Sequence, residues 1–164
     1  MSRSIRPTWK VAALAAVVLL LASSCSKSSS TPAPPIYNVF AQQFKFHGMP
    51  ASIPSGNLQI NFSNKESFPI THEMILKALP AGDTAQDIID SAKVPGCEGG
   101  GPCETQYLAY GEIAGVDTGA TLSNVFDLPA GNYFFACWET GTQSGGTDGP
   151  PHASKGMVYT FKVT

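Results

Sequence analysis

From residue 36 to the end of the chain, short segments in which hydrophobic and polar residues alternate are separated by turns rich in Gly and Pro. Alternation with a period of two turns one side of a segment toward a core and the other toward solvent, as in a β-strand. We therefore expect strands at residues 37–46, 58–62, 71–79, 106–110, 120–127, 132–137 and 158–163. Short strands joined by such turns indicate an all-β sandwich.

One segment has the period of a helix instead. Ile88, Ile89 and Ala92 would form an apolar stripe on one side of a helical turn. Asp83 or Thr84 precedes this stripe and can cap the first amides of the helix. We expect one short helical insertion in the sandwich.

Composition supports a single folded domain. The chain has 164 residues, of which 43% are hydrophobic and 13% are charged, so it can bury one sizeable core and is too apolar to be disordered. The formal charge is −2, and removal of the three cations within residues 1–24 would change it to −5. An acidic domain lacks the basic face that phosphate binding requires, so we expect no nucleic-acid partner.

The first 24 residues have the pattern of a secretory signal. Three cations, Arg3, Arg6 and Lys10, precede an apolar segment at residues 11–22. That segment is shorter than the roughly 20 apolar residues that span a bilayer. We expect residues 1–24 to be a signal peptide and the mature protein to be exported.

Residues 21–25, Leu-Ala-Ser-Ser-Cys, resemble the bacterial lipobox, whose cysteine is acylated after cleavage. We therefore expect a lipoprotein-type signal peptide, with Cys25 anchoring a periplasmic or cell-surface protein to the membrane. Ordinary cleavage near Ser24, which would leave a free thiol, is the alternative. Residues 25–35 are rich in Ser and Pro and form a flexible tether ahead of the domain at residues 36–164.

Two of the four cysteines, Cys97 and Cys103, flank a short Gly-rich segment without hydrophobic neighbours. In an exported protein such a pair forms a disulfide, and closing so small a loop contributes roughly 2 kcal/mol. A metal-binding or redox dithiol is the alternative, but the sequence offers no further ligand nearby.

Cys137 then has no cysteine partner. His72 precedes it, and His152 and Met157 follow it, in a chain with only three histidines. Each of these residues taken singly is more simply a core or surface residue. Together, two imidazoles, a thiolate and a thioether form the ligand set of a mononuclear copper site, because sulfur stabilises Cu(I) and imidazole binds both oxidation states.

The sequence resembles the cupredoxins, the plastocyanin-like copper proteins, from Phe44 to Thr164. The resemblance consists of Pro54-x-Gly56, Asn64 ahead of His72-Glu73, Leu128-Pro129-x-Gly131-x-Tyr133-x-x-x-Cys137, and His152-x-x-x-x-Met157.

The resemblance implies a Greek-key β-sandwich that binds one copper ion. It makes His72, Cys137 and His152 the equatorial ligands and Met157 the axial one. It also implies a one-electron carrier that meets a redox partner protein in the cell envelope, with the imidazole of His152 near solvent as the electron port. We expect a monomer.

Two features depart from the cupredoxin pattern. Residues 138–151 separate Cys137 from His152, a longer segment than plastocyanins have. Because loop-closure entropy grows slowly with length, tripling a loop costs only about 1 kcal/mol, which leaves copper binding possible. Glu73 follows the first histidine where many copper-binding members have Asn, and we expect its side chain to point away from the metal.

The residues bear on three other functions. His47-x-Met49 and His72-x-Met74 have a spacing that some periplasmic Cu(I) carriers use, which would suit copper storage or delivery; we expect His47 and Met49 on the surface. A cupredoxin-fold module that binds another protein without functional copper is the second. Catalysis is the third and has no support, because three histidines cannot supply a second copper centre and no nucleophile motif occurs.

Overall fold

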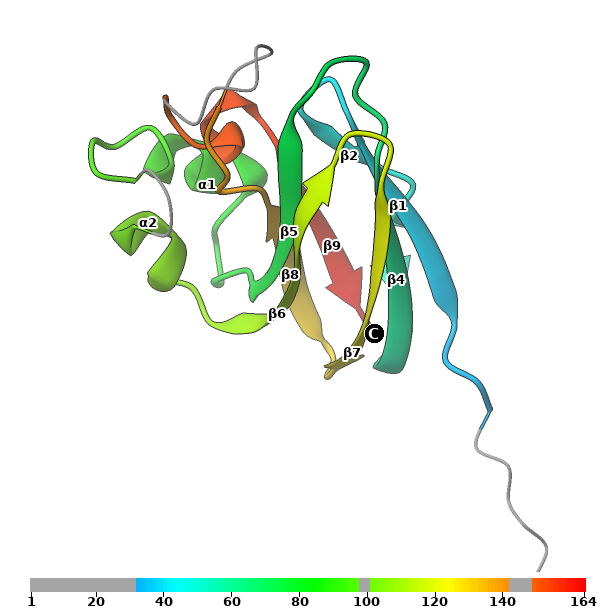
Figure 1. The fold of residues 1–164 in the computed structure, drawn as a ribbon. Helices are drawn as coiled ribbons and strands as arrows, with labels where there is room; N and C mark the ends of the chain where they lie inside the picture. The colour runs from blue at the N-terminus through cyan, green and yellow to red at the C-terminus, as the bar shows by residue number, and fades with distance from the viewer. Residues whose placement is uncertain (1–31, 98–100, 142–148) are drawn as a thin grey trace, which may run out of the picture. The chain divides into compact units, whose positions relative to one another are not determined.

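Two β-sheets face each other across a hydrophobic core (Figure 1). The four-stranded sheet has the order β2 (Lys45–His47), β1 (Ile36–Gln42), β4 (Gly56–Asn64) and β7 (Thr121–Leu128). The five-stranded sheet has the order β3 (Ser52–Ile53), β9 (Val158–Val163), β8 (Gly131–Ala136), β5 (Thr71–Ala78) and β6 (Ala109–Asp117). The predicted all-β sandwich is confirmed.

The computed structural model describes residues 32–97, 101–141 and 149–164. The expected signal peptide, Cys25 and most of the expected tether lie outside these residues, as does most of the Gly-rich part of the segment between Cys137 and His152. The unit Ala33–Thr164 is compact by itself. Within the described ranges, no helix is long and apolar enough to cross a membrane.

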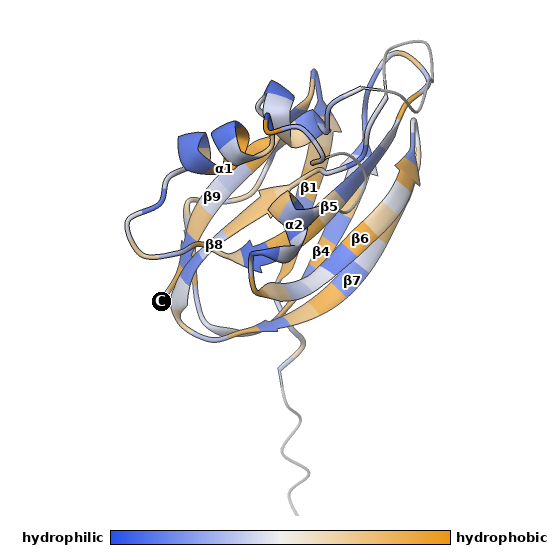
Figure 2. Cartoon of the chain, turned by 90° about the vertical axis from the view of Figure 1, so that its left-hand side faces the viewer, coloured by the Kyte–Doolittle hydropathy of each residue, from blue (hydrophilic) through white to orange (hydrophobic). Residues whose placement is uncertain are grey.

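Alternating hydropathy orients the strands. Along β4 the buried residues alternate with partly exposed ones, as predicted for residues 58–62, and Figure 2 shows the same alternation in colour. β4 pairs with β1 in parallel and with β7 in antiparallel fashion. One face of this sheet therefore covers the core and the other remains open to solvent.

β8 is the exception, because it is buried on both faces. Alternate residues of this segment, Tyr133, Phe135 and Cys137, belong to the core between the sheets. The residues between them, Phe134, Ala136 and Trp138, belong to a second hydrophobic cluster on the opposite face of the sheet. A strand covered on both sides explains why residues 132–137 are almost continuously apolar.

Helices cover that second face (Figure 1). The cluster includes Ile88 of α1 (Ala85–Ser91), Ala92 directly after α1, Cys103 of α2 (Pro102–Thr105) and Ala153 of the 3₁₀-helix η1 (His152–Lys155). Thr84 caps α1 as predicted. Its backbone amide and its hydroxyl both donate to Oδ2 of Asp87, at 2.8 and 2.7 Å. α1 is the expected helical insertion, and α2 and η1 add single turns.

Cys97 and Cys103 form a disulfide beside these helices. The expectation that they lack hydrophobic neighbours is wrong, because both sulfurs belong to the second hydrophobic cluster and both residues are buried. Nζ of the buried Lys77 lies 3.8 Å from a carboxylate oxygen of Glu104, next to the disulfide in sequence. The ion pair between Lys77 of β5 and Glu104 of α2 therefore attaches α2 to the five-stranded sheet.

The strand expected at residues 37–46 is a hairpin instead. β1 ends at Gln42 and β2 begins at Lys45, and the two are paired in antiparallel fashion. The turn between them has positive φ at both central residues, 53° at Gln43 and 55° at Phe44. Such a turn normally contains Gly, Asn or Asp, so its sequence carries no turn signal. The strand expected at residues 106–110 is also displaced, because β6 begins at Ala109 and continues to Asp117.

Candidate metal centre

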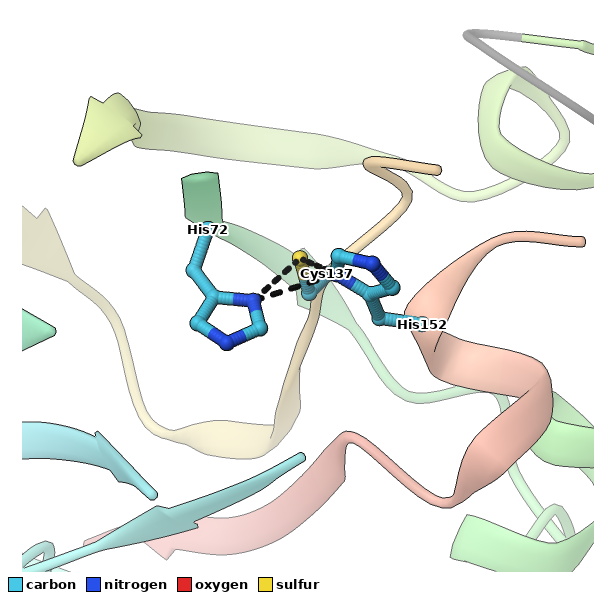
Figure 3. A group of neighbouring side chains, drawn as sticks. All are labelled: His72, Cys137 and His152. Atoms are coloured by element: carbon cyan, nitrogen blue, oxygen red, sulfur yellow. Dashed lines mark hydrogen bonds between the residues drawn. The ribbon is translucent and has the colours of Figure 1, made fainter. Parts of the chain in front are cut away.

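Three of the four expected copper ligands meet inside the sandwich (Figure 3). His72 is the second residue of β5, Cys137 directly follows β8, and His152 begins η1. The Nδ1 atoms of the two imidazoles are 3.1 Å apart. Sγ of Cys137 lies 3.7 Å from Nδ1 of His72 and 3.4 Å from Nδ1 of His152.

These separations fit three ligands of one metal ion. With zinc as the guide, nitrogen binds at about 2.0 Å and sulfur at about 2.3 Å, so donors in a trigonal plane lie roughly 3.5 to 3.7 Å apart. The observed separations are within a few tenths of an ångström of these values. At 3.1 Å the two Nδ1 atoms can share one proton at most, so at least one lone pair faces the centre of the group. The donor set of His72, Cys137 and His152, with Met157 nearby, fits one mononuclear copper ion.

Burial sets the protonation of the three donors. His72, Cys137 and His152 are all fully buried. Desolvation lowers the pKa of His72, although its contact with the Glu66 carboxylate opposes this shift. Desolvation, together with the nearby His72 and Lys155, lowers the pKa of His152 to about 3. Both imidazoles are therefore neutral at pH 7, which is the form that binds a metal.

Desolvation has the opposite consequence for the thiol and raises the pKa of Cys137 well above its usual range. The backbone amide of Glu73 donates to Sγ of Cys137 at 3.4 Å, which favours the thiolate but does not outweigh burial. A bound cation would supply the missing compensation, since a metal-bound cysteine is deprotonated. The metal-free protein holds a thiol at neutral pH, and a bound metal ion would convert it to a thiolate.

Glu73 links β5 to the strand end that carries Cys137. Its carboxylate Oε1 accepts a hydrogen bond of 2.8 Å from the backbone amide of Trp138. Desolvation raises the pKa of Glu73 to about 7, against the effect of that hydrogen bond. Both the backbone and the side chain of Glu73 therefore hold the residues around Cys137 in place.

The long segment between Cys137 and His152 is closed at its base. The amide of His152 donates to the carbonyl of Glu139 at 2.9 Å, and the amide of Ala153 donates to the carbonyl of Cys137 at 2.7 Å. These bonds fix His152 relative to Cys137 independently of the residues in between. The length of residues 138–151 therefore does not separate the two donors.

Met157 lies beside two of these residues, Cys137 and His152. Its carbonyl accepts a hydrogen bond from the amide of Cys137 at 3.3 Å, and its amide donates to the carbonyl of His152 at 3.2 Å. Gly156 precedes it with a φ of 97°, a left-handed conformation that ends η1 and turns the chain back into β9. The Met157 side chain is fully buried in the core that also contains Cys137.

Comparisons with known proteins give a fold but no close relative. No family model matches the sequence, and no curated protein matches it. An auracyanin from the photosynthetic bacterium Roseiflexus castenholzii superposes with a TM-score of 0.54 at 16% identity, over 82% of this chain and 99% of the other. Auracyanin A from Chloroflexus aurantiacus gives 0.54 at 17% identity, over 80% and 100% of the two chains. Auracyanin B gives 0.52 at 21% identity, over 82% and 93%.

The chain has the cupredoxin fold. The three donors lie where two strands and one helical turn of this cupredoxin sandwich converge (Figure 3). In one respect the site differs from expectation, because His152 is not near solvent but fully buried. The ring of the half-buried Phe44 packs edge-on against it, with centroids 4.9 Å apart, and prevents the expected exposure.

Two residues at this metal centre, Phe44 and Glu66, carry no sequence signal. Phe44 also packs edge-on against His72, at 5.7 Å, and Lys155 lies 4.5 Å from the centre of the Phe44 ring. Glu66 lies 3.3 Å from Nε2 of His72. The sequence predicts Phe44 as part of the strand at residues 37–46, and Glu66 lies in a polar segment without hydrophobic periodicity. Only the folded chain brings them to the donors.

Proposed function

We propose that this protein is a blue copper protein that binds one ion through His72, Cys137, His152 and Met157 and carries single electrons. The observation that carries the proposal is the convergence of two neutral imidazole Nδ1 atoms and one sulfur, all buried, within 4.8 Å of one another. The cupredoxin fold supports it, since auracyanin A, a structural neighbour, is a blue copper protein. The proposal does not include catalysis.

The chain's contribution to electron transfer is a rigid, dry site. Copper supplies a one-electron couple between Cu(I) and Cu(II). Backbone hydrogen bonds fix Cys137 to Met157 and Ala153, and the Glu73 amide steadies its sulfur. Full burial of His72 and His152 excludes water from the donors. A site that keeps the same geometry in both oxidation states has a small reorganisation energy for electron transfer.

The proposed location is the cell envelope. We propose that residues 1–24 are removed, that Cys25 carries a lipid anchor, and that residues 25–35 hold the domain away from the membrane. The supporting observations are the sequence pattern and the disulfide between Cys97 and Cys103, which suits an oxidising compartment. There the protein would act as a monomer that meets a redox partner protein.

Repeated redox cycling distinguishes an electron carrier from a copper delivery protein. The purified protein, with Cys25→Ser to remove the other free thiol, is loaded with Cu(II), reduced with ascorbate and reoxidised with ferricyanide in the presence of a Cu(I) chelator. We expect copper to stay bound through several rapid cycles, because a chelator removes copper from buried donors more slowly than electrons are exchanged. Transfer of the copper to the chelator on the first reduction would instead indicate delivery.

The affinity for Cu(I) should rise with pH, because one proton is released for each copper ion that binds. The raised pKa of Cys137 keeps the thiol protonated at neutral pH, and the lowered pKa values of His72 and His152 leave both imidazoles neutral. Above the pKa of Glu73, which is about 7, binding releases only the thiol proton, so the apparent Cu(I) association constant should rise about 10-fold per pH unit between roughly pH 8 and 9. Chelator competition across this range measures the slope. A constant affinity would show that the thiolate is not a ligand.

A further inference from the structure

Glu66 is a buried carboxylate outside the group of metal donors. Its side chain is 2% exposed, and it lies in the segment between β4 and β5. Burying a carboxylate costs several kcal/mol unless hydrogen bonds compensate. One of its oxygens, Oε1, has two partners: the backbone amide of Phe44 at 2.9 Å and Nε2 of His72 at 3.3 Å. Both partners belong to the surroundings of the metal centre.

The contact with His72 selects a tautomer. An ionised carboxylate only accepts hydrogen bonds, so Nε2 of His72 must carry the proton and Nδ1 must carry the lone pair. Nδ1 is the atom that faces Cys137 and His152, at 3.7 and 3.1 Å. In metal sites, a carboxylate behind a histidine fixes the orientation of the ring and strengthens its nitrogen as a donor.

The contact with Phe44 holds a strained turn. Gln43 and Phe44 both have left-handed backbones, which costs a residue with a side chain roughly 1 kcal/mol or more. The hydrogen bond from the Phe44 amide to Glu66 is a charge-assisted one and offsets part of this cost. In this conformation the Phe44 ring packs against both imidazoles, with centroids 5.7 Å from His72 and 4.9 Å from His152.

Glu66 is itself held in place from β4. Oδ1 of Asn64 accepts from the Glu66 amide at 3.1 Å, and Nδ2 of Asn64 donates to the carbonyls of Ile70 and Val116 at 2.7 and 2.9 Å. Asn64 is fully buried and thereby joins β4, the segment before β5, and β6. The backbone of Glu66 is therefore fixed by the fold independently of His72.

We propose that Glu66 is a positioning residue of the metal centre: one carboxylate oxygen turns Nδ1 of His72 toward the metal and fixes the Phe44 ring over both imidazoles. The inference rests on the proposed copper site. Because a negative charge behind His72 favours Cu(II) over Cu(I), Glu66 also lowers the reduction potential of the bound copper.

Two variants test this role. Glu66→Gln keeps the shape but removes the charge, and it should reduce the preference for Cu(II) over Cu(I) about 10-fold, which is an upward shift of about 59 mV for a one-electron couple. Glu66→Ala removes both contacts. Asp127→Asn, which removes an exposed carboxylate of β7, is the matched control and should leave the potential unchanged.

The second readout needs no copper. In ¹⁵N NMR spectra of the metal-free protein at pH 7, His72 should be a single tautomer with its proton on Nε2, and nuclear Overhauser contacts should join the rings of Phe44 and His152. In Glu66→Ala we expect mixed tautomers and weaker contacts. An Nδ1-protonated His72 in the unmodified protein, or unchanged tautomer and potential in both variants, would overturn the role of Glu66. Failure of the unmodified protein to bind copper would overturn the proposed function instead, while the tautomer measurement still decides the role of Glu66.

Discussion

Replacing Cys137 with Ala should lower the affinity for Cu(I) at least roughly 100-fold. Cys137 Sγ is the one sulfur in the group of three converging donors, and soft sulfur is the ligand that favours Cu(I). Structural zinc sites bind with about 10–16 kcal/mol over four ligands, which suggests about 3 kcal/mol for one of them. A loss of 3 kcal/mol corresponds to roughly 100-fold in the dissociation constant. Competition with a Cu(I) chelator in the Cys25→Ser background measures the change.

The matched control for Cys137→Ala is Met49→Leu. Met49 is the sulfur of the alternative His47-x-Met49 pair, which would bind Cu(I) in a delivery protein. Contrary to the sequence-based expectation for this residue, Met49 is buried in the core, while His47 is exposed and stacks on Phe40 with ring centroids 5.0 Å apart. The pair is thus divided between core and surface, and Met49→Leu should leave Cu(I) affinity unchanged. The opposite pattern, with a loss in Met49→Leu only, would assign copper binding to that pair.

Replacing Phe135 with Ala should lower the free energy of unfolding of the metal-free protein by about 3–5 kcal/mol. Phe135 is fully buried on β8, with ring centroids 4.8 Å from Phe161 and 5.9 Å from Phe46. Phe161 lies on the neighbouring strand and Phe46 on the opposite sheet. Removing the Phe135 ring would therefore leave a cavity between the two sheets. Since domains of this size are stable by only about 5–15 kcal/mol, the loss is a large share of the total.

Urea unfolding followed by circular dichroism measures this loss, with Val125→Thr as the control. Val125 lies on the edge strand β7 and is 55% exposed, so its replacement should change the free energy of unfolding by no more than about 0.5 kcal/mol. Equal, small effects of the two substitutions would contradict the assignment of Phe135 to the core. Because Cys137 follows Phe135 by two residues on the same face, we also expect Phe135→Ala to weaken copper binding.

The sequence was sufficient for the parts of the fold that local pattern determines. The strand predicted at residues 158–163 is β9, and the helix predicted after Thr84 is α1. The turn at Gln43 and Phe44 could not be predicted, because its left-handed residues are held by a hydrogen bond to Glu66, which lies 22 residues away from Phe44. Contacts over such separations leave no trace in hydrophobic periodicity.

For the candidate site, residue chemistry was enough to select the three donors but not their surroundings. The order of His72, Cys137 and His152 in the chain pointed to a copper site, and the fold brings these three together. The burial of His152 could not be predicted, since it involves Phe44 from the distant turn between β1 and β2. The carboxylate of Glu66 behind His72 could not be predicted either, because a polar segment such as residues 63–67 is normally exposed.

The visible spectrum after addition of one equivalent of Cu(II) tests the central claim most directly. The protein in the Cys25→Ser background is compared with the same protein carrying Cys137→Ala. The account predicts an intense blue or green band from a thiolate–copper bond in the former, saturating at one ion per chain, and no such band in the latter. A well-folded protein that shows no band and takes up no Cu(I) would contradict the account, and the cupredoxin sandwich would then serve a purpose other than copper binding.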